Sequence, residues 1–278
     1  MTLSTVSKVS WLQPKRLQTK LLVSFLAIGM VPMVLVGLLS CSSTCKVIFE
    51  RAGQRMQSTS VEVADKIDRN LFERFGDVQA FAFNPMAVES PEKATAAANF
   101  YTVNYGCYDL MIITNTEGQI VACNTVTFEG KPLDTSSLVG RSVKGEDWFQ
   151  QCISGQISEG ESFTSDLGKD HETSLAYRDE RISLNYSAPI RNSDGKIVGV
   201  WSNRASFDRI VDKIRTEQVA AHKADGNDVE IQIINNQGLA LTDADPKAVM
   251  KLNVIDQGMQ SAILGAKGET GFVQEVHA

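Results

Sequence analysis

Acidic residues are missing from the first 49 positions of the sequence, although the whole chain of 278 residues contains 33 Asp and Glu. The same stretch carries Lys8, Lys15, Arg16 and Lys20, so a basic N-terminus precedes an acidic remainder, and the formal net charge is −6. An acidic globular part repels the phosphates of nucleic acids. We therefore expect no DNA or RNA partner.

Histidine is scarce, and the common catalytic motifs are missing. The three histidines, His171, His222 and His277, form no metal-ligand or nucleophile pattern. The sequence has no Walker loop, no G-x-S-x-G and no G-x-G-x-x-G between a strand and a helix. Asp170 and Glu172 flank His171, but adjacent residues on a loop rarely converge on one ion, so we interpret them as a solvated loop. We predict no enzyme, no catalytic residue, no metal site and no cofactor.

No C-x-x-C pair occurs among the five cysteines, which are Cys41, Cys45, Cys107, Cys123 and Cys152. Their odd number and irregular spacing specify no disulfide. We interpret the last three as apolar core residues.

Charge is also absent from residues 21–39, a run of apolar side chains. A helix of about 19 residues spans about 28 Å, which matches the hydrocarbon thickness of a bilayer. We predict a transmembrane helix at residues 21–40 and, by the positive-inside rule, a cytoplasmic leader at residues 1–20. The chain would then be a single-pass protein of the cell inner membrane, with its larger part on the periplasmic or extracellular side.

Two other interpretations of this segment compete with an anchor. A cleaved signal peptide has a shorter apolar core than the run found here. The sequence around Cys41 resembles a lipoprotein processing site, which makes a membrane-tethered binding lipoprotein without signalling output the alternative function.

Residues 44–84 contain few turn signals, and their apolar residues follow helical spacing of three and four. We predict one long signalling helix that ends near Pro85; a helix pair is the alternative. We also expect this helix to pair with its copy in a homodimer. Residues 94–103 predict a second, shorter helix.

Strand-like segments follow. Residues 110–123 and 231–241 each read as strand, Asn-to-Gly turn and strand, which predicts two β-hairpins. After each hairpin an amphipathic stretch runs to residue 153 or to residue 264. Because the parts recur in the same order, we interpret them as two related modules.

The first module continues with strands at residues 181–190 and 196–202, and then a helix at residues 207–218. We place this module at residues 85–219 and a second, partial module at residues 220–278. The predicted fold class is α+β, with a transmembrane helix, a long helix and two PAS-like antiparallel-sheet modules, the second of them truncated.

This arrangement resembles the extracellular double Cache domain of bacterial chemotaxis receptors and sensor kinases. The local resemblances lie at residues 109–122, at residues 140–155 around Asp147-Trp148-Phe149, and at residues 186–190 with 194–200. The resemblance implies sensing of a small polar ligand in the module farther from the membrane, with signal transfer across the membrane, as in chemotaxis. Many relatives that bind amino acids carry an arginine where this chain has Glu146, and an aspartate where it has Arg204.

The resemblance also implies a ligand-binding site. Its aromatic wall would include Trp148 and Phe149, and the further residues that we predict are Asp166, Tyr177, Tyr186, Asn203 and Arg204. Arg204 would suit an anionic ligand group, because its planar fork binds carboxylates. The alternative is that Trp148 and Tyr186 are core residues, Asp166 a turn residue and Arg204 a surface charge.

Overall fold

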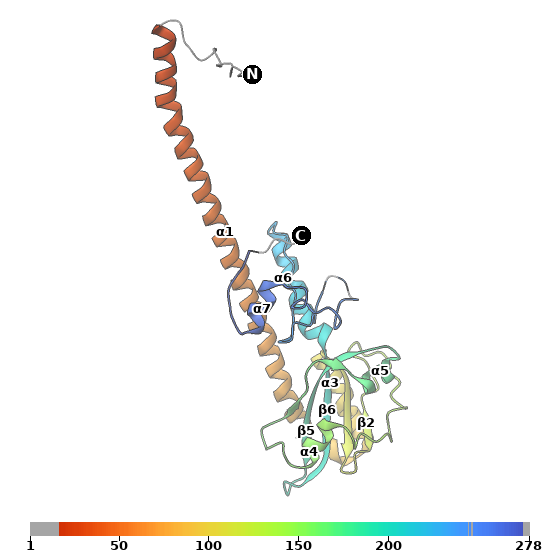
Figure 1. Cartoon of the computed structure of the whole chain (residues 1–278). Coiled ribbons are helices and arrows are strands. Elements are labelled where there is room, and N and C mark those ends of the chain that lie inside the picture. The colour runs from red at the N-terminus through yellow and green to blue at the C-terminus, as the bar shows by residue number, and fades with distance from the viewer. Residues whose placement is uncertain (1–16, 244, 246, 275–278) are drawn as a thin grey trace, which may run out of the picture. The chain divides into compact units, whose positions relative to one another are not determined.

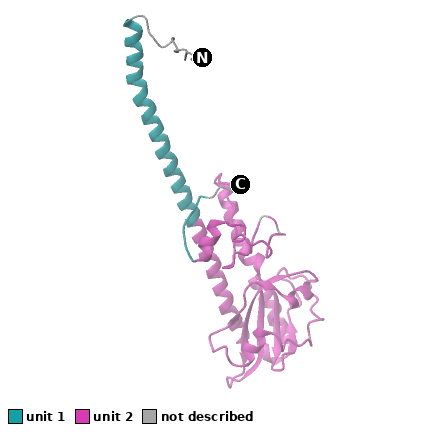
Figure 2. Ribbon diagram, in the orientation of Figure 1, with its two compact units in different colours: residues 1–58, 268–278 teal, residues 59–267 magenta. Residues whose placement is uncertain are grey.

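A computed structural model describes residues 17–243, 245 and 247–274. Most of the predicted leader, residues 1–16, and His277 lie outside this part. The described residues form two compact units: those up to 58 together with those from 268 onward, and those within residues 59–267 (Figure 2).

Helix α1, Leu17–Ala82, contains both the apolar run and the amphipathic segment that follows it. This confirms one continuous helix instead of a helix pair. The described part of the chain has one helix that is long and apolar enough to cross a bilayer, and it is α1. The helix ends before Pro85, where the side chain of Asn84 accepts a hydrogen bond from the backbone N–H of Met86.

Two helices follow α1 closely. Helix α2, Met86–Glu89, is a single turn, and α3, Pro91–Tyr105, is the predicted second helix. The hydroxyl of Ser90 accepts from the backbone N–H of Lys93 at the start of α3, and Gly106 ends it in a left-handed conformation.

A six-stranded antiparallel sheet forms the centre of the larger unit (Figure 1). The strands are β1 Tyr108–Asn115, β2 Ile120–Cys123, β3 Phe163–Thr164, β4 Gly168–Lys169, β5 Ile182–Arg191 and β6 Ile197–Ser206. Their order is β2-β1-β6-β5-β3, and β4 also pairs with β5. The first predicted hairpin and the strand pair β5–β6 are thus confirmed.

Helices cover both faces of this sheet. One hydrophobic cluster joins Tyr108 and Trp201 of the sheet to Phe81 of α1 and Ala98 of α3. The other lies across the sheet and contains residues of helices α4, Asp147–Ile153, and α5, His171–Tyr177. Because side chains of a strand alternate between faces, each strand residue belongs to either the α1 face or the α4–α5 face.

The internal repeat is visible in the backbone hydrogen bonds of residues 110–153 (the first repeat) and residues 231–264 (the second repeat). The side chain of Asn115 accepts from the N–H groups of Glu117 and Gln119, and the side chain of Asn235 accepts from those of Gln237 and Leu239. The N–H groups of Val143 and Val254 donate to the carbonyls of Gly118 and Gly238. The backbone N–H of Gly140 donates to the carbonyl of Ile120, and that of Met250 donates to the carbonyl of Ala240. Both donating residues adopt a positive φ, of 85° at Gly140 and 59° at Met250. The two segments therefore share the hydrogen bonds of their turns, and their origin as two related modules stays a prediction.

The second hairpin differs from the prediction. Its residues form isolated bridges, Ile234 with Ala240 and Leu239 with Asn253, and the described residues after Ser206 contain no strand longer than a bridge. A hairpin without further strands beside it is marginal, which explains the difference. Between the repeats lie a π-helical turn, Asp208–Asp212, and helix α6, Lys213–Ala224; helix α7, Gln260–Ala266, ends the second repeat.

Candidate functional site

A cavity of about 370 Å³, here called the charged cavity, lies on the α4–α5 face of the sheet. It is bordered by the start of α4, the segment from β3 to the start of α5, the start of β5 and the end of β6. Its lining residues are Glu146, Asp147, Trp148, Phe163, Ser165, Asp166, Gly168, Lys169, Asp170, His171, Glu172, Ser183, Asn185 and Arg204.

Arg204 is the centre of this cavity. It lies in β6 between Leu110 of β1 and Asn185 of β5, and it is 1% exposed. Its Nε is 2.5 Å from the Oδ2 of Asp170, and its guanidinium lies over the ring of Trp148, with 5.1 Å to the ring centroid. The interpretation of Arg204 as a surface charge is therefore wrong.

The remaining nitrogens of Arg204 also have partners in the protein. Nη1 donates to the hydroxyl of Ser202, and Nη2 lies 4.0 Å from the Oε2 of Glu172. A guanidinium that already faces two carboxylates gains less from a third anion than an unpaired one does. An arginine without a partner was the reason to expect an anionic ligand group at Arg204, and that reason no longer holds.

Asp170 is held in place by the start of α5. Its Oδ1 accepts from the N–H and the hydroxyl of Thr173, as an N-cap residue does. Burial by itself would raise the pKa of the Asp170 carboxyl, but the charge of Arg204 and the hydrogen bonds from Thr173 outweigh it and lower that pKa. Glu172 is 7% exposed. The expected solvated loop is therefore wrong for both carboxylates, although His171 is exposed.

Two residues of the charged cavity have a buried polar atom without a hydrogen-bond partner. These atoms are the Nε1 of Trp148 and the Oγ of Ser183. Buried polar groups in proteins are normally paired, so an unpaired donor beside a cavity indicates a place for a ligand or water.

The charges around the cavity are unequal. Five of its lining residues are Asp or Glu, and two, Lys169 and Arg204, are basic. Both basic groups contact carboxylates of the protein, Lys169 that of Glu180 at 2.7 Å. The cavity therefore has an excess of negative charge.

The predicted site residues divide between the two faces of the sheet. Trp148 and Arg204 line the charged cavity, as does Asp166, which is exposed between β3 and β4. Tyr186 pairs in register with Asn203, and both belong to the α1 face, where the amide of Asn203 accepts from the indole of Trp201.

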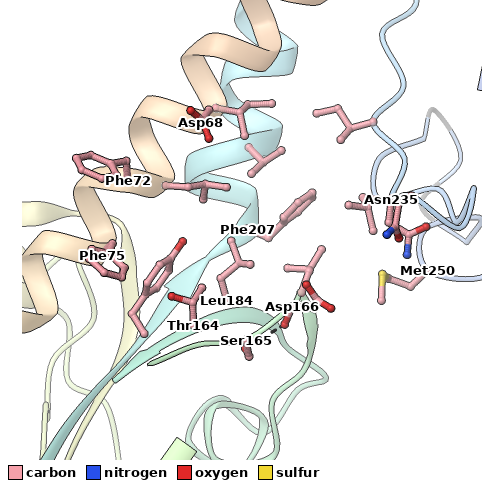
Figure 3. A pocket seen from close by; sticks show the side chains of 18 of the residues that line it. Asp68, Phe72, Phe75, Thr164, Ser165, Asp166, Leu184, Phe207, Asn235 and Met250 are labelled. Atoms are coloured by element: carbon pink, nitrogen blue, oxygen red, sulfur yellow. Dashed lines mark hydrogen bonds between the residues drawn. The ribbon is translucent and has the colours of Figure 1, made fainter. Parts of the chain in front are cut away.

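Tyr186 lines a different cavity, here called the apolar cavity, of about 680 Å³ (Figure 3). Burial raises the pKa of its phenol to about 12. Asp166 lines both cavities.

The other two predicted residues lie in or beside the core of the α4–α5 face. Phe149 is 1% exposed and packs with Trp148 edge to face at 6.1 Å. Tyr177 donates its hydroxyl hydrogen to the carbonyl of Asp109. Neither residue lines the charged cavity.

Sequence reasoning missed Asp170, Glu172 and Ser183. The available signal was Asp170 followed by Glu172, because Asp is favoured at helix N-caps and acidic residues are favoured in the first helical turn. Nothing local marks Ser183.

Comparison with solved structures identifies the fold. No protein-family model matches the chain, and no curated protein matches its sequence. The chain is similar to the domain of a putative sensory box/GGDEF family protein from Vibrio parahaemolyticus, at 12% identity and a TM-score of 0.56, covering 81% of this chain and 86% of that one. It is also similar to the extracellular domain of a putative histidine kinase, at 12% identity and a TM-score of 0.52, covering 78% and 76%.

A third similar structure is the ligand-binding domain of the amino acid chemoreceptor PctC of Pseudomonas aeruginosa, in complex with GABA. Here the identity is 12% and the TM-score 0.50, covering 82% of this chain and 87% of that one. The chain therefore has the fold of Cache-type extracellular sensor domains, and the predicted α+β PAS-like architecture is confirmed.

Proposed function

We propose that this chain is an extracytoplasmic sensor that binds a small, positively charged polar ligand in the charged cavity. The observation that carries the proposal is the cavity itself, with carboxylates in excess and two buried polar atoms without a partner. A cation is favoured where negative charge is uncompensated and water is scarce. The fold shared with ligand-binding domains of receptors, one of which holds GABA, supports sensing over catalysis.

Six of the lining residues have a role in this proposal. Glu172 and Asp147 would attract the cationic end of the ligand, and Arg204 would hold Asp170 and Trp148 in position. The indole N–H of Trp148 and the hydroxyl of Ser183 would pair with a polar group of the ligand. Phe149, Tyr177, Tyr186 and Asn203 have structural roles instead.

A physical connection between this cavity and α1 supports signalling. Arg204 pairs with Leu110 in β1, and the same strand begins at Tyr108, which donates a hydrogen bond of 2.6 Å to Asp77 of α1. Arg74 of α1 is 3.1 Å from the same carboxylate. Ligand binding would shift α1 only as far as its affinity differs between two arrangements of these contacts.

The test is a thermal-shift screen of the full chain in lipid nanodiscs, with pairs of molecules that differ in charge at one end, such as butylamine and butyrate. We expect stabilisation by amines, and a loss of affinity of about tenfold in Glu172→Gln and in Trp148→Phe, since each removes one polar contact. Glu159→Gln, an exposed carboxylate outside the charged cavity, is the matched control. Stabilisation by carboxylates alone would favour the original anion hypothesis for Arg204.

We place the chain in the cell inner membrane, with α1 as an uncleaved anchor and the larger unit outside the cytoplasm. Cys41 lies within α1, far from either helix end. If it is not lipidated, Cys41→Ala leaves membrane attachment and apparent mass unchanged. Loss of attachment would support the lipoprotein alternative.

We also propose a homodimer through α1, because several apolar residues of this helix outside the apolar run are exposed: Ile48 at 61%, Met56 at 56% and Val61 at 43%. Cys41 and Cys45 are exposed free thiols on α1. Oxidation of the native chain in membranes should crosslink two copies through these cysteines, and Cys41→Ser with Cys45→Ser should abolish the crosslink. A chain that stays monomeric under oxidation at every expression level would contradict the dimer.

A further inference from the structure

The apolar cavity is bounded by three parts of the larger unit that are distant in sequence. Phe72 and Phe75 come from α1, Leu184 and Phe207 from the sheet and the segment after it, and Met250 from the second repeat (Figure 3). All of these residues belong to the unit of residues 59–267. With about 680 Å³, the cavity has room for a ligand of drug-like size.

Its wall is mostly aliphatic and aromatic. Phe72 and Phe75 stack at 6.3 Å with an interplanar angle of 11°, and Phe72 is 72% exposed. A large aromatic ring exposed at the mouth of an apolar cavity is unfavourable in water and indicates a binding surface. Methionine on the opposite wall adapts easily to the shape of a ligand.

The charged residues at this cavity are all acidic. Asp68 of α1 and Asp166 of the β3–β4 segment both line it, and no Lys, Arg or His is among its lining residues. Asp68 lies on the α1 side of the cavity and Asp166 on the sheet side (Figure 3). An apolar body with a positive end therefore fits the cavity better than the same body with a negative end.

We propose that the apolar cavity is a second ligand site, for an amphipathic small molecule with an aromatic body and a cationic end. The body packs against Phe72 and Phe75, and the cationic end lies near Asp68. This site differs from the charged cavity, which lies on the other face of the sheet. The two cavities have only Ser165 and Asp166 in common. The inference does not depend on the proposed function of the charged cavity.

Occupancy of this site has a structural consequence. Its ligand contacts α1, the sheet and the second repeat at once, so it stabilises the arrangement in which these three parts enclose it. The stabilisation equals the difference in affinity between that arrangement and any other. A ligand here therefore biases the position of α1 and acts as a modulator of the sensor.

The experiment uses three water-soluble probes: 3-phenylpropylamine, its acidic counterpart 3-phenylpropanoate, and propylamine, which lacks the ring. Each is titrated calorimetrically into the full chain in lipid nanodiscs, with empty nanodiscs as background. We expect the aromatic amine to bind most tightly. Its affinity should fall about fivefold to tenfold in Phe72→Ala and in Asp68→Asn, because each removes one of the two kinds of contact.

Two controls separate this site from other parts of the chain. Phe83→Ala removes a phenylalanine that is 88% exposed and lies outside the apolar cavity, so it should leave the affinity unchanged. Trp148→Phe alters only the charged cavity, so it should weaken propylamine binding but leave unchanged the factor by which the aromatic amine binds more tightly than propylamine. Equal binding of amine and acid, or a loss of binding in Trp148→Phe but not in Phe72→Ala, would overturn the proposal. So would a Phe72→Ala variant that changes the oligomeric state but not the affinity, since a second copy would then occupy the cavity.

Discussion

The two repeats of this chain have the same turns but different surroundings. In the first repeat, the turn at Asn115 and Gly118 connects two strands of a six-stranded sheet. In the second repeat, the same hydrogen bonds form at Asn235 and Gly238, but the flanking residues make only isolated bridges. The comparison shows that turn chemistry is local, whereas strands require partners on either side.

The largest difference concerns buried charge. The first module buries the charged side chain of Arg204 between two carboxylates. Among the described residues of the second repeat, the buried polar side chain is that of Thr242, which is uncharged. Arg204→Met should leave the carboxylates of Asp170 and Glu172 without their cationic partner and lower the free energy of unfolding by about 3–5 kcal/mol. Urea denaturation followed by the fluorescence of the buried Trp148 and Trp201 measures it.

The control for that substitution is a surface ion pair. Arg178 contacts Asp134 at 3.1 Å, with side chains that are 80% and 60% exposed. Arg178→Met should have little effect because solvent already screens this pair. A similar loss of unfolding free energy in Arg178→Met and Arg204→Met would show that the burial of Arg204 does not determine the size of the effect.

The next difference concerns the equivalent glycines, which both need positive φ, +80° at Gly118 and +83° at Gly238. A Cβ at Gly118 would lie 2.9 Å from the backbone Cα of Lys144, whereas at Gly238 it would lie 2.5 Å from the side chain of Ile255 and 2.7 Å from that of Asn253, so that only side chains would need to move. We expect Gly118→Ala to cost about 2–3 kcal/mol and Gly238→Ala about 1–2 kcal/mol. Denaturation of both variants side by side tests the order, and the reverse order would contradict it.

A smaller effect is expected at the asparagines that hold the two turns. Asn115→Ala and Asn235→Ala each remove two hydrogen bonds from backbone N–H groups to the Asn side chain. We expect each substitution to cost about 1 kcal/mol of local stability. In the first repeat the loss should lower global stability, because the turn belongs to the sheet. In the second repeat it should chiefly accelerate hydrogen exchange at Gln237 and Leu239. Equal effects on global stability would mean that the second repeat unfolds together with the sheet.

The smallest expected effect is on the pH dependence of stability. The pKa of Asp170 is lower in the folded chain than its ordinary value near 4, so folding favours the ionised carboxylate. Its contribution is present above about pH 4 and is lost as the pH falls toward the folded-state pKa. Asp170→Asn should therefore flatten the acid limb of a stability profile. An unchanged slope in Asp170→Asn would contradict this cause.

Much of the fold follows from local sequence. The apolar run and the amphipathic spacing predict α1 because helix periodicity is a property of the segment itself. Asn115 with Gly118, and Asn235 with Gly238, predict their turns because an Asn side chain bonds the backbone two residues on and Gly accepts positive φ. The resemblance to double Cache domains, drawn from the order of such elements, also indicated the fold correctly.

The site depended more on tertiary structure. Alternation along β6 already implies that Asn203 and Arg204 face opposite sides of the sheet, so both could not line one cavity. The sequence does not tell which side α1 covers, since both sides of β6 are buried. The partner of Arg204 lies 34 residues away at Asp170, at the start of a helix that the sequence does not bring near β6. Only the packing of α5 against the sheet joins these charges, because electrostatic contacts depend on distance in space and not along the chain.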